Sequence, residues 1–299
     1  MAKPFIKWVG GKSQLIPEIT QRLPEYVEKG LPYQYVEPFT GSAAVALYLL
    51  DSPTPPTKVI LSDINTDLVN LYEVVKSHPQ KLLDFLQTLQ DEYDQLEDKE
   101  AKKPYYYAKR EEFNLRENNT VKHAGLFMFL NRAGFNGLYR VNSKNQFNVP
   151  IGSYKQPKFV FEEVIHRASE LLTNVEMLNT SFEDTLRTAQ ETNIDNLPTF
   201  VYLDPPYKPL SESSSFTSYA KDSFNDDDQV KLKQVCDLLN EQGYQWLLSN
   251  SDTTNLDPEN KFFDELYSEY TIERVSAGRS INSKGSKRGK INELLIRNY

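Results

Sequence analysis

Short apolar or alternating runs are separated along the chain by longer stretches whose apolar residues recur at helical spacing. The runs have the length and residue types of strands; one begins near residue 34, and the others cover residues 58–63, 174–179, 200–203, 244–249, 270–275 and 291–297. Helical spacing is found in residues 13–23, 46–50, 67–129, 182–188 and 226–239. This alternation predicts an α/β fold in which helices flank an open sheet.

The strand predicted at residues 200–203 stops abruptly at Asp204. Pro205 and Pro206 lack the backbone donor that a strand interior needs, so the strand cannot continue through them. Ligands of open α/β sheets bind beyond the carboxyl ends of the strands, which predicts that Asp204 and Tyr207 face a crevice. An ordinary strand followed by a surface turn is the alternative.

This group of residues suits an exocyclic amine on a nucleobase. Asp204 and the Pro205 carbonyl can accept the two amine hydrogens, while Tyr207 stacks on the ring. The amine lone pair is then free to attack an electrophilic methyl group. The sequence therefore indicates methyl transfer to a base.

Two glycine turns indicate where a nucleotide-like ligand would bind. Gly10 and Gly11 precede a predicted helix, where Lys12 can anchor an anionic group; an ordinary helix cap is the alternative. Gly41 lies between a strand and a helix, as in a nucleotide-binding βα unit, although the further glycines of a dinucleotide fingerprint are absent. Asp63 ends the next strand, where an acid either binds ribose hydroxyls or caps the following helix.

Residues 130–150 contain two arginines, several asparagines and no acid. Two short strands, 138–141 and 146–149, are predicted to flank a turn at 142–145 and to form a β-hairpin. Such a hairpin suits a DNA groove, because Arg pairs with guanine and Asn with adenine or an orphaned base. Phe135 is placed to wedge into the gap left by an extruded base. An exposed polar hairpin without function is the alternative, but it leaves the lack of acids unexplained.

Charge is unevenly distributed over the chain, whose formal net charge is −8. Residues 131–158 contain five basic residues and no acid, and residues 271–299 contain seven basic residues and two acids. Because local charge matters more than net charge for nucleic-acid binding, we expect both segments to face phosphates.

Length and composition narrow the classes of protein to which the chain can belong. A chain of 299 residues with 39% hydrophobic content can form one large domain or one domain with an insertion. The single cysteine, Cys236, excludes an intramolecular disulfide and is expected inside a helix, and the three histidines lack metal-ligand spacing, so we expect no metal. The amino terminus has no signal-peptide pattern and no apolar run could span a bilayer, which favours a cytoplasmic protein without membrane attachment.

The motifs together resemble the Dam family of DNA adenine methyltransferases, which modify adenine within GATC. They follow the family's order over nearly the whole chain: Phe5-Ile-Lys-Trp-Val-Gly-Gly-Lys, Val36-Glu-Pro-Phe-Thr-Gly, Leu61-Ser-Asp-Ile-Asn, Phe135-Asn-Gly-Leu-Tyr-Arg, Phe147-Asn-Val-Pro and Asp204-Pro-Pro-Tyr. The run from Asn142 to Pro150 resembles the bacterial restriction-modification subgroup. That likeness favours a restriction endonuclease as a functional partner; a repair pathway and a phage defence system are the alternatives.

The resemblance implies S-adenosylmethionine as methyl donor, double-stranded DNA as substrate, base flipping, and direct transfer without a metal. The implied cofactor-binding residues are Trp8, Lys12, Glu37, Phe39, Gly41, Asp63 and Asp204. The implied catalytic residues, which hold the flipped adenine, are Asp204, Pro205, Pro206 and Tyr207. The implied DNA-binding residues are Lys7, Phe135 at the intercalating position, Asn136, Leu138, Arg140 and Pro150.

The resemblance also implies a Rossmann-like methyltransferase sheet with helices on both faces, formed by residues 1–66 and 170–299. Residues 67–169 would form an inserted target-recognition domain of helices and a β-hairpin. The Ser-rich residues 209–224 are expected to form a mobile lid near the crevice. Ala43 stands where the family often has a second glycine, which implies a tighter cofactor turn here.

Three alternatives remain open at this stage. The planar amine could belong to cytosine or to a glutamine side chain instead of adenine. The chain could be a DNA-binding protein that kept the fold and lost turnover. A small-molecule methyltransferase is the third alternative, although it gives no reason for the acid-free hairpin.

Overall fold

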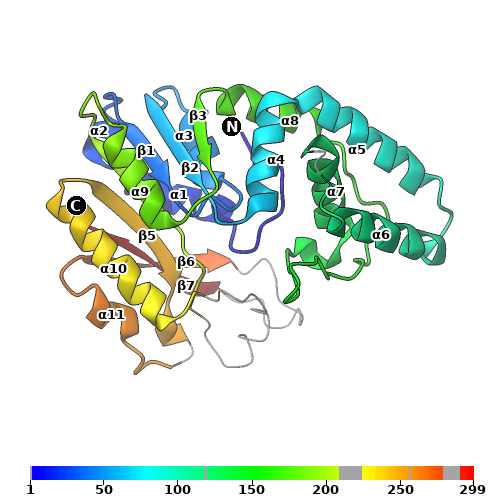
Figure 1. The fold of residues 1–299 in the computed structure, drawn as a ribbon. Helices are drawn as coiled ribbons and strands as arrows, with labels where there is room; N and C mark the ends of the chain where they lie inside the picture. Colours follow the sequence, from blue (N-terminus) through cyan, green and yellow to red (C-terminus); the bar gives the residue numbers. More distant parts are fainter. Residues whose placement is uncertain (1, 118–119, 209–223, 256, 279–289) are drawn as a thin grey trace.

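The computed structural model describes residues 2–117, 120–208, 224–255, 257–278 and 290–299 (Figure 1). The expected lid at residues 209–224, apart from Phe224, and most of the basic loop at 277–290 lie outside the described residues. The strands are β1 (Gln34–Glu37), β2 (Lys58–Ser62), β3 (Val175–Leu178), β4 (Thr199–Leu203), β5 (Gln245–Ser251), β6 (Thr271–Gly278) and β7 (Lys290–Arg297).

These strands form one seven-stranded sheet in the order β3-β2-β1-β4-β5-β7-β6. The first five strands are mutually parallel, whereas β7 runs antiparallel to β5 and β6. Consecutive parallel strands need crossover connections, which the helices supply. The predicted α/β sheet is confirmed, and the strands predicted from residues 58, 174, 200, 244, 270 and 291 all form with small shifts of their ends.

Alternate residues of the central strands enter two different hydrophobic clusters. In β4, Phe200 and Tyr202 pack on one face of the sheet and Val201 and Leu203 on the other. Both faces are buried, which explains why these strands read as continuous apolar runs in the sequence.

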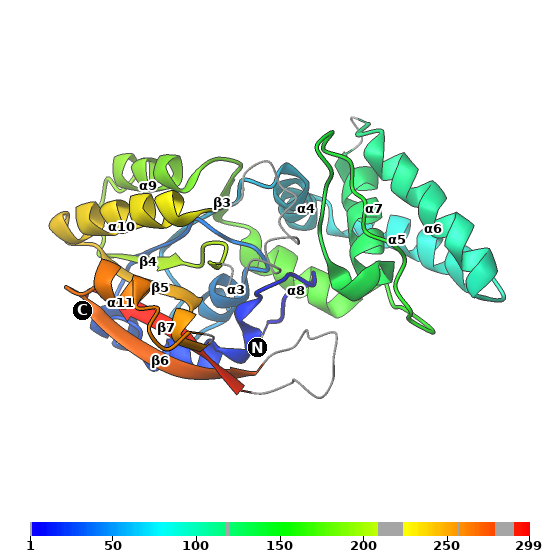
Figure 2. The same ribbon diagram turned by 90° about the horizontal axis from the view of Figure 1, so that it is seen from below.

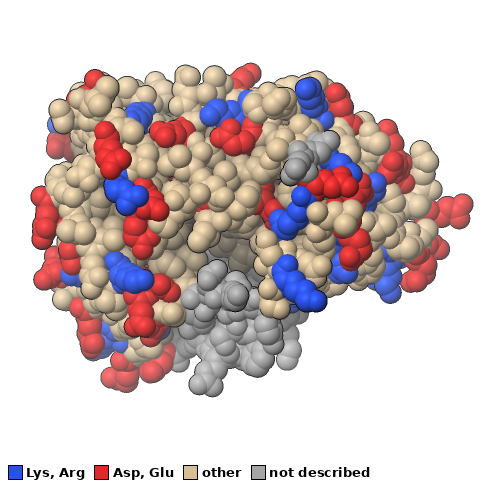
Figure 3. Space-filling model, viewed as in Figure 1, with Lys and Arg blue, Asp and Glu red and all other residues tan. Residues whose placement is uncertain are grey.

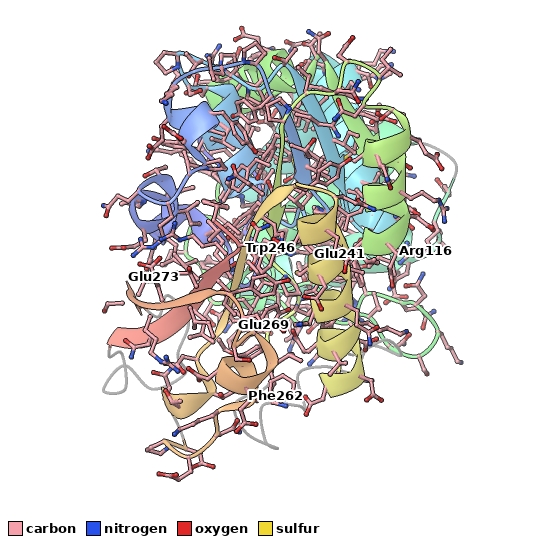
Figure 4. The ribbon with its side chains drawn as sticks, turned by 90° about the vertical axis from the view of Figure 1, so that its left-hand side faces the viewer. Arg116, Glu241, Trp246, Phe262, Glu269 and Glu273 are labelled. Carbon is pink, nitrogen blue, oxygen red and sulfur yellow. The ribbon has the colours of Figure 1, made fainter. Side chains whose placement is uncertain are left out.

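Helices cover both faces, as predicted. The first face carries α1 (Ile16–Thr20), α2 (Glu25–Glu28) and α3 (Ala44–Leu50), and the second carries α9 (Phe182–Glu191), α10 (Asp226–Glu241) and α11 (Phe262–Leu266). Trp246 of β5 belongs to the second face and is labelled beside α10 in Figure 4. Cys236 is buried there, inside α10 as expected, and burial raises the pKa of its thiol.

The segment between β2 and β3 forms the helical part that lies to one side of the sheet (Figure 2). Its helices are α4 (Thr66–Ser77), α5 (Pro79–Asp94), α6 (Lys99–Asn114), α7 (Thr120–Ala133) and α8 (Glu162–Leu172). We call residues 67–169 the inserted part. Its apolar residues join the cluster on the first face of the sheet, so one continuous core holds the two parts together.

Two local predictions differ from the structure. Residues 13–23 do not form one helix; the 3₁₀ turn η1 (Lys12–Gln14) is followed by the five-residue α1, which begins at Ile16, has Pro17 in its first turn and ends at Thr20. Proline is accepted in a first helical turn, where its missing N–H is not needed.

The second difference concerns the hairpin, which is confirmed only in part. Residues 138–141 and 146–149 form no regular strands, but the two arms pair at the isolated antiparallel bridge Val141–Phe147, where Asn142 N donates to Gln146 O over 2.9 Å and Asn148 N to Arg140 O over 3.1 Å. The turn at 142–145 is present, with Asn145 N donating to Asn142 O over 2.9 Å. We refer to residues 138–149, which the sequence predicts to read DNA, as the recognition loop. In the described part of the chain, no helix has the length and apolarity required to cross a bilayer.

Candidate functional site

Three carboxylates are brought to the carboxyl edge of the parallel sheet. Glu37 is the last residue of β1, Asp63 follows β2 and Asp204 follows β4. Since β1 lies between β2 and β4, the topology places these carboxylates side by side, as expected for the ligand-binding edge of an α/β sheet. We call this the crevice.

Asp204 is held from two sides. Its side chain is 18% exposed, and Lys12 Nζ lies 2.7 Å from its Oδ1. Ser249 Oγ donates to the same oxygen over 3.0 Å. Within the described residues, Oδ2 receives no hydrogen bond, so this oxygen is available to a ligand. Burial raises the pKa of Asp204, although the Lys12 ammonium and the Ser249 hydroxyl oppose the rise.

Tyr207 has a fixed ring. Its hydroxyl donates to Glu293 Oε2 over 2.6 Å, and Lys12 Nζ lies 4.5 Å from its ring centroid. The turn before it is also held, because Gln229 Nε2 donates to the Pro206 carbonyl over 3.2 Å. Lys12 thus contacts both the carboxylate and the aromatic ring that follow β4.

Gly41 and Trp8 form a close backbone turn beside Asp63. Gly41 has φ +47°, and a Cβ on this residue would lie 2.8 Å from Trp8 Cδ1, so no larger residue fits without a shift. Gly41 N donates to Asp63 Oδ2 over 3.1 Å, and Tyr72 OH donates to the Gly41 carbonyl over 2.9 Å. Asp63 does not cap α4, since Asn65 does so by accepting from Leu68 N.

Ala43 adopts a left-handed conformation with φ 52° at the N-cap of α3. L-residues adopt this conformation at a cost of about 1–2 kcal/mol, which explains why glycine suits the position. The turn therefore forms with alanine, under local backbone strain.

Glu37 is fully buried beneath this turn. Tyr35 OH donates to its Oε2 over 2.7 Å and Ala46 N over 3.1 Å. Burial raises the pKa of Glu37 to about 8; the hydrogen bond from Tyr35 opposes the rise, and the nearby Asp204 carboxylate adds to it. Glu37 is therefore mostly protonated at neutral pH. Phe39 stacks on Phe182 with ring centroids 5.3 Å apart, and it forms an aromatic wall further along the same turn.

The predicted DNA-contacting residues gather on the inserted part and the amino-terminal segment. Phe135 is 47% exposed, and Asn136 and Pro150 are exposed beside it. Arg140 Nε donates to Asn148 Oδ1 over 2.6 Å, which orients the guanidinium. Leu138 is half-buried.

Lys7 joins this group from a distant part of the sequence. A Cβ on Gly137 would lie 2.8 Å from Lys7 Cβ, so the two segments are in close contact. Lys7 Nζ lies 4.6 Å from the ring centroid of Tyr154, an exposed aromatic residue that the sequence reasoning did not select.

Asn131 is a further residue that sequence reasoning missed. It is buried in α7, where its Oδ1 accepts from Lys7 N over 3.1 Å and its Nδ2 donates to Lys7 O and Gly137 O over 2.8 and 2.9 Å. One side chain therefore joins Lys7 to the turn that carries Phe135. Its only signal in the sequence is an amide that interrupts the apolar run 126–130.

Asn114 has a comparable role for the recognition loop. Its Oδ1 accepts from Phe147 N over 2.8 Å and its Nδ2 donates to Phe147 O over 3.1 Å. Since the bonds between the two arms flank Phe147, its own N–H and C=O face away from the other arm, and the Asn114 amide offers them both an acceptor and a donor.

Several arginines expected at phosphate-facing surfaces have other partners. Arg132 is mostly buried, donates to Phe5 O over 2.7 Å and lies 4.2 Å from the Phe161 ring centroid; burial lowers its pKa to about 10. Arg274 pairs with Asp252 and Asp264, and Arg297 pairs with Glu273. In these positions the guanidinium stabilises the fold; that the two basic segments face phosphates stays a prediction.

The surface is hollowed where the inserted part meets the sheet (Figure 3). Lys and Arg side chains lie on the right-hand rim of this hollow. Among the described residues, no group of three or more His, Cys, Asp or Glu is arranged to hold a metal ion.

Comparison with known proteins gives consistent matches. The family model for D12 class N6 adenine-specific DNA methyltransferases matches residues 8–281. The type II methyltransferase M.MjaIII of Methanocaldococcus jannaschii is 46% identical over 300 residues, which cover 99% of each chain. The type II methyltransferase M1.LlaDCHI of Lactococcus lactis subsp. cremoris is 38% identical over 99% of this chain and 95% of its own. A DNA adenine methylase of Escherichia coli is 36% identical over 98% of this chain and 94% of its own.

Proposed function

Because the chain belongs to the D12 class of N6 adenine-specific DNA methyltransferases, we propose that it methylates the adenine of GATC in double-stranded DNA. We further propose that S-adenosylmethionine is the donor and that the target base is flipped into the crevice. The observation that carries the proposal is the contact of Lys12 with both Asp204 and Tyr207, which leaves Asp204 Oδ2 free.

The residues of the crevice fit S-adenosylmethionine. Asp63 presents a carboxylate at the end of β2, where an acid can accept hydrogen bonds from ribose hydroxyls. Gly41, without a side chain, lets the backbone turn lie close against Trp8, and Phe39 offers an aromatic wall for a purine. Glu37 lies beneath the turn and shapes it through Ala46 N. Lys12 would face the donor from beside Asp204, whose Oδ1 it contacts.

S-adenosylmethionine supplies an electrophilic methyl group on a sulfonium. The chain's residues prepare the nucleophile: Asp204 Oδ2 accepts one hydrogen of the adenine amine, and the Pro205 carbonyl accepts the other. Tyr207 stacks on the base, and its bond to Glu293 fixes the plane of the ring. Pro206 holds the turn rigid through its locked backbone and its bond from Gln229.

Proton balance follows from the same residues. When the amine nitrogen forms its bond to the methyl carbon, the bond between that carbon and the sulfonium sulfur breaks, S-adenosylhomocysteine is released and one N–H proton becomes surplus. Asp204 is placed to accept it, and burial, which raises the pKa of Asp204, favours the protonated carboxyl. No covalent enzyme intermediate is needed.

The choice of GATC rests on the resemblance of the recognition residues to those of the Dam family. Arg140 presents an oriented guanidinium that suits guanine, and Asn136 suits the base left without a partner. Phe135 is exposed where a ring could fill the gap in the stack. Lys7, Leu138 and Pro150 lie on the same surface.

Two of the similar proteins are named type II methyltransferases. On that basis we propose that the chain acts with a restriction endonuclease and protects the cell's own sites in the cytoplasm. We propose residues 1–66 and 170–299 as the catalytic domain and residues 67–169 as the target-recognition domain.

The test uses purified protein, labelled S-adenosylmethionine and two duplexes that differ only in carrying GATC or GTTC. The DNA is digested to nucleosides after the reaction. Label in N6-methyladenine from the GATC duplex alone is the expected result. Label in both duplexes would discard the proposed site, and label in N4-methylcytosine would discard adenine as the target.

A further inference from the structure

A buried carboxylate lies outside the crevice, between the sheet and the recognition loop. Asp67 is the second residue of α4, four residues after Asp63, and is 3% exposed. It accepts hydrogen bonds from three side chains: Arg116 at the end of α6, His123 in α7 and Tyr139 in the recognition loop. His123 Nε2 lies 2.8 Å from Oδ1, and Tyr139 OH lies 2.7 Å from Oδ2.

This arrangement keeps the carboxylate charged. Burial alone would raise the pKa of Asp67, but the bonds from His123, Arg116 and Tyr139 outweigh it and lower the pKa to about 2. A buried ion of this kind costs several kcal/mol of desolvation, which only its partners offset. The three partners are therefore held tightly to one point.

Two of the partners control the recognition loop. Tyr139 lies between Leu138 and Arg140 in the sequence, so its anchored hydroxyl fixes the backbone that carries both side chains. Arg116 uses its other terminal nitrogen, Nη2, to donate to Asn145 O over 2.9 Å at the turn of the loop. Asp67 thereby restrains the first arm and the turn at once.

Tyr139 also touches the cofactor side of the molecule. Its ring centroid lies 5.9 Å from that of Trp8, and Trp8 lies against Gly41. Gly41 in turn bonds to Asp63. The same tyrosine therefore packs against the wall of the proposed cofactor pocket and positions the proposed DNA-reading residues.

We propose that Asp67, through Tyr139, is a positioning residue that couples cofactor binding to DNA binding. The inference rests on the cofactor and DNA sites of the proposed function. When the cofactor orders Trp8, it also restrains Tyr139 and with it the recognition loop. DNA binding then costs less conformational entropy, because part of the loop is already ordered. By linkage, DNA must tighten cofactor binding by the same factor.

The experiment measures the dissociation constant of S-adenosylhomocysteine by calorimetry, with and without a saturating GATC duplex. Tyr139→Phe keeps the ring on Trp8 and removes only the bond to Asp67. The matched control is Tyr105→Phe, because Tyr105 OH donates to Glu92 Oε2 over 2.6 Å in the same inserted part, away from the crevice. Thermal unfolding of each variant checks the fold.

In the unchanged protein and in Tyr105→Phe, the duplex should tighten S-adenosylhomocysteine binding by roughly 5- to 150-fold. In Tyr139→Phe the factor should fall to about 2 or less, with binding in the absence of DNA nearly unchanged. If the Tyr139 hydroxyl only stabilised the fold, Tyr139→Phe would have a lower melting temperature, but the duplex would still tighten S-adenosylhomocysteine binding by the same factor as in the unchanged protein.

The inference would be overturned if the duplex tightened S-adenosylhomocysteine binding by the same factor in Tyr139→Phe as in the unchanged protein. It would also be overturned if the duplex had no effect on that binding in the unchanged protein. Failure of the parent protein to bind S-adenosylhomocysteine under either condition would instead overturn the proposed cofactor site, and the coupling with it. Asp67→Asn, which keeps the size of the side chain and weakens all three bonds, should reproduce the loss seen in Tyr139→Phe.

Discussion

The crevice and the recognition loop are built in different ways. Asp63 and Asp204 stand at the ends of parallel strands, so the sheet itself determines their spacing. The recognition loop has one isolated bridge between its arms and depends on side chains of the neighbouring helices, chiefly Asn114 and Asp67, while Asn131 holds Gly137 just before it. We therefore expect that the methyl-transfer step and the choice of DNA site can be changed by separate substitutions. Substitutions that affect the recognition loop should act through the side chains that support it.

Removal of the central carboxylate should have the largest effect. Asp204→Ala deprives the amine of its acceptor, and we expect the rate of the methyl-transfer step to fall by at least about 10²–10³-fold. Single-turnover methylation measures it. Asp195→Asn, which alters an exposed carboxylate before β4, is the control. Normal methylation by Asp204→Ala would remove the basis of the mechanism.

Lys12→Met should come next, because it leaves the largely buried Asp204 without its cation. Loss of the ammonium raises the pKa of Asp204 further, so the acidic limb of the pH–rate profile should move to higher pH. The profile of kcat against pH measures the shift. Lys29→Met, which breaks an exposed ion pair with Glu25, should leave the profile in place. A shift toward lower pH in Lys12→Met would contradict the assigned contact.

On the loop side, Arg140→Ala should weaken discrimination at one base pair of the site by about 1–3 kcal/mol. Affinity for the cofactor alone should not change, since Arg140 contacts Asn148 and not the crevice. Competition between duplexes altered at each position measures the discrimination. Lys144→Ala removes an exposed charge from the same loop and should weaken binding to all duplexes alike.

Glu37 offers a test of the crevice through stability. Its folded pKa of about 8 lies above the value near 4.5 expected for an unfolded chain. The folded state therefore holds the proton over this range, and the free energy of unfolding should fall as pH rises from about 4.5 to 8, by up to about 1.4 kcal/mol per pH unit. Glu37→Gln should flatten this slope in urea titrations. An equal slope in both proteins would show that Glu37 ionises normally.

The smallest effect is expected at the cofactor turn. Ala43→Gly removes left-handed strain of about 1–2 kcal/mol but gives up a buried methyl group and raises the entropy of the unfolded chain, each worth about 0.5–1 kcal/mol. These terms nearly cancel, so the melting temperature should hardly change. A large loss of stability would mean that the methyl group supports the turn.

Sequence predicted the parts of the molecule that follow from local patterns. The strands, the acid at the end of β4 and the turn at Gly41 all come from residue types within a short window. The pairing of Lys12 with Asp204 depends on how the chain folds back on itself, and no spacing reveals it.

The recognition loop was predicted less well for a related reason. Its residues alternate as in a hairpin, and the two arms do pair across the turn, but only at one isolated bridge. The outward-facing backbone groups of Phe147 bind Asn114, which lies in another helix, so no local pattern reveals this support. Asp67 and Asn131 escaped notice because a single polar residue within a helix has no distinctive local pattern.

The most direct test of the separation between crevice and loop is single-turnover methylation of GATC and of duplexes with one altered base pair. It would be run with the unchanged protein, Lys12→Met and Arg140→Ala. The account predicts that Lys12→Met lowers the methylation rate on all duplexes by a similar factor, so the ratio of the rates on GATC and on each altered duplex stays the same. Arg140→Ala should change this ratio for the duplex altered at one position. A changed ratio in Lys12→Met, or a uniform slowing in Arg140→Ala, would contradict it.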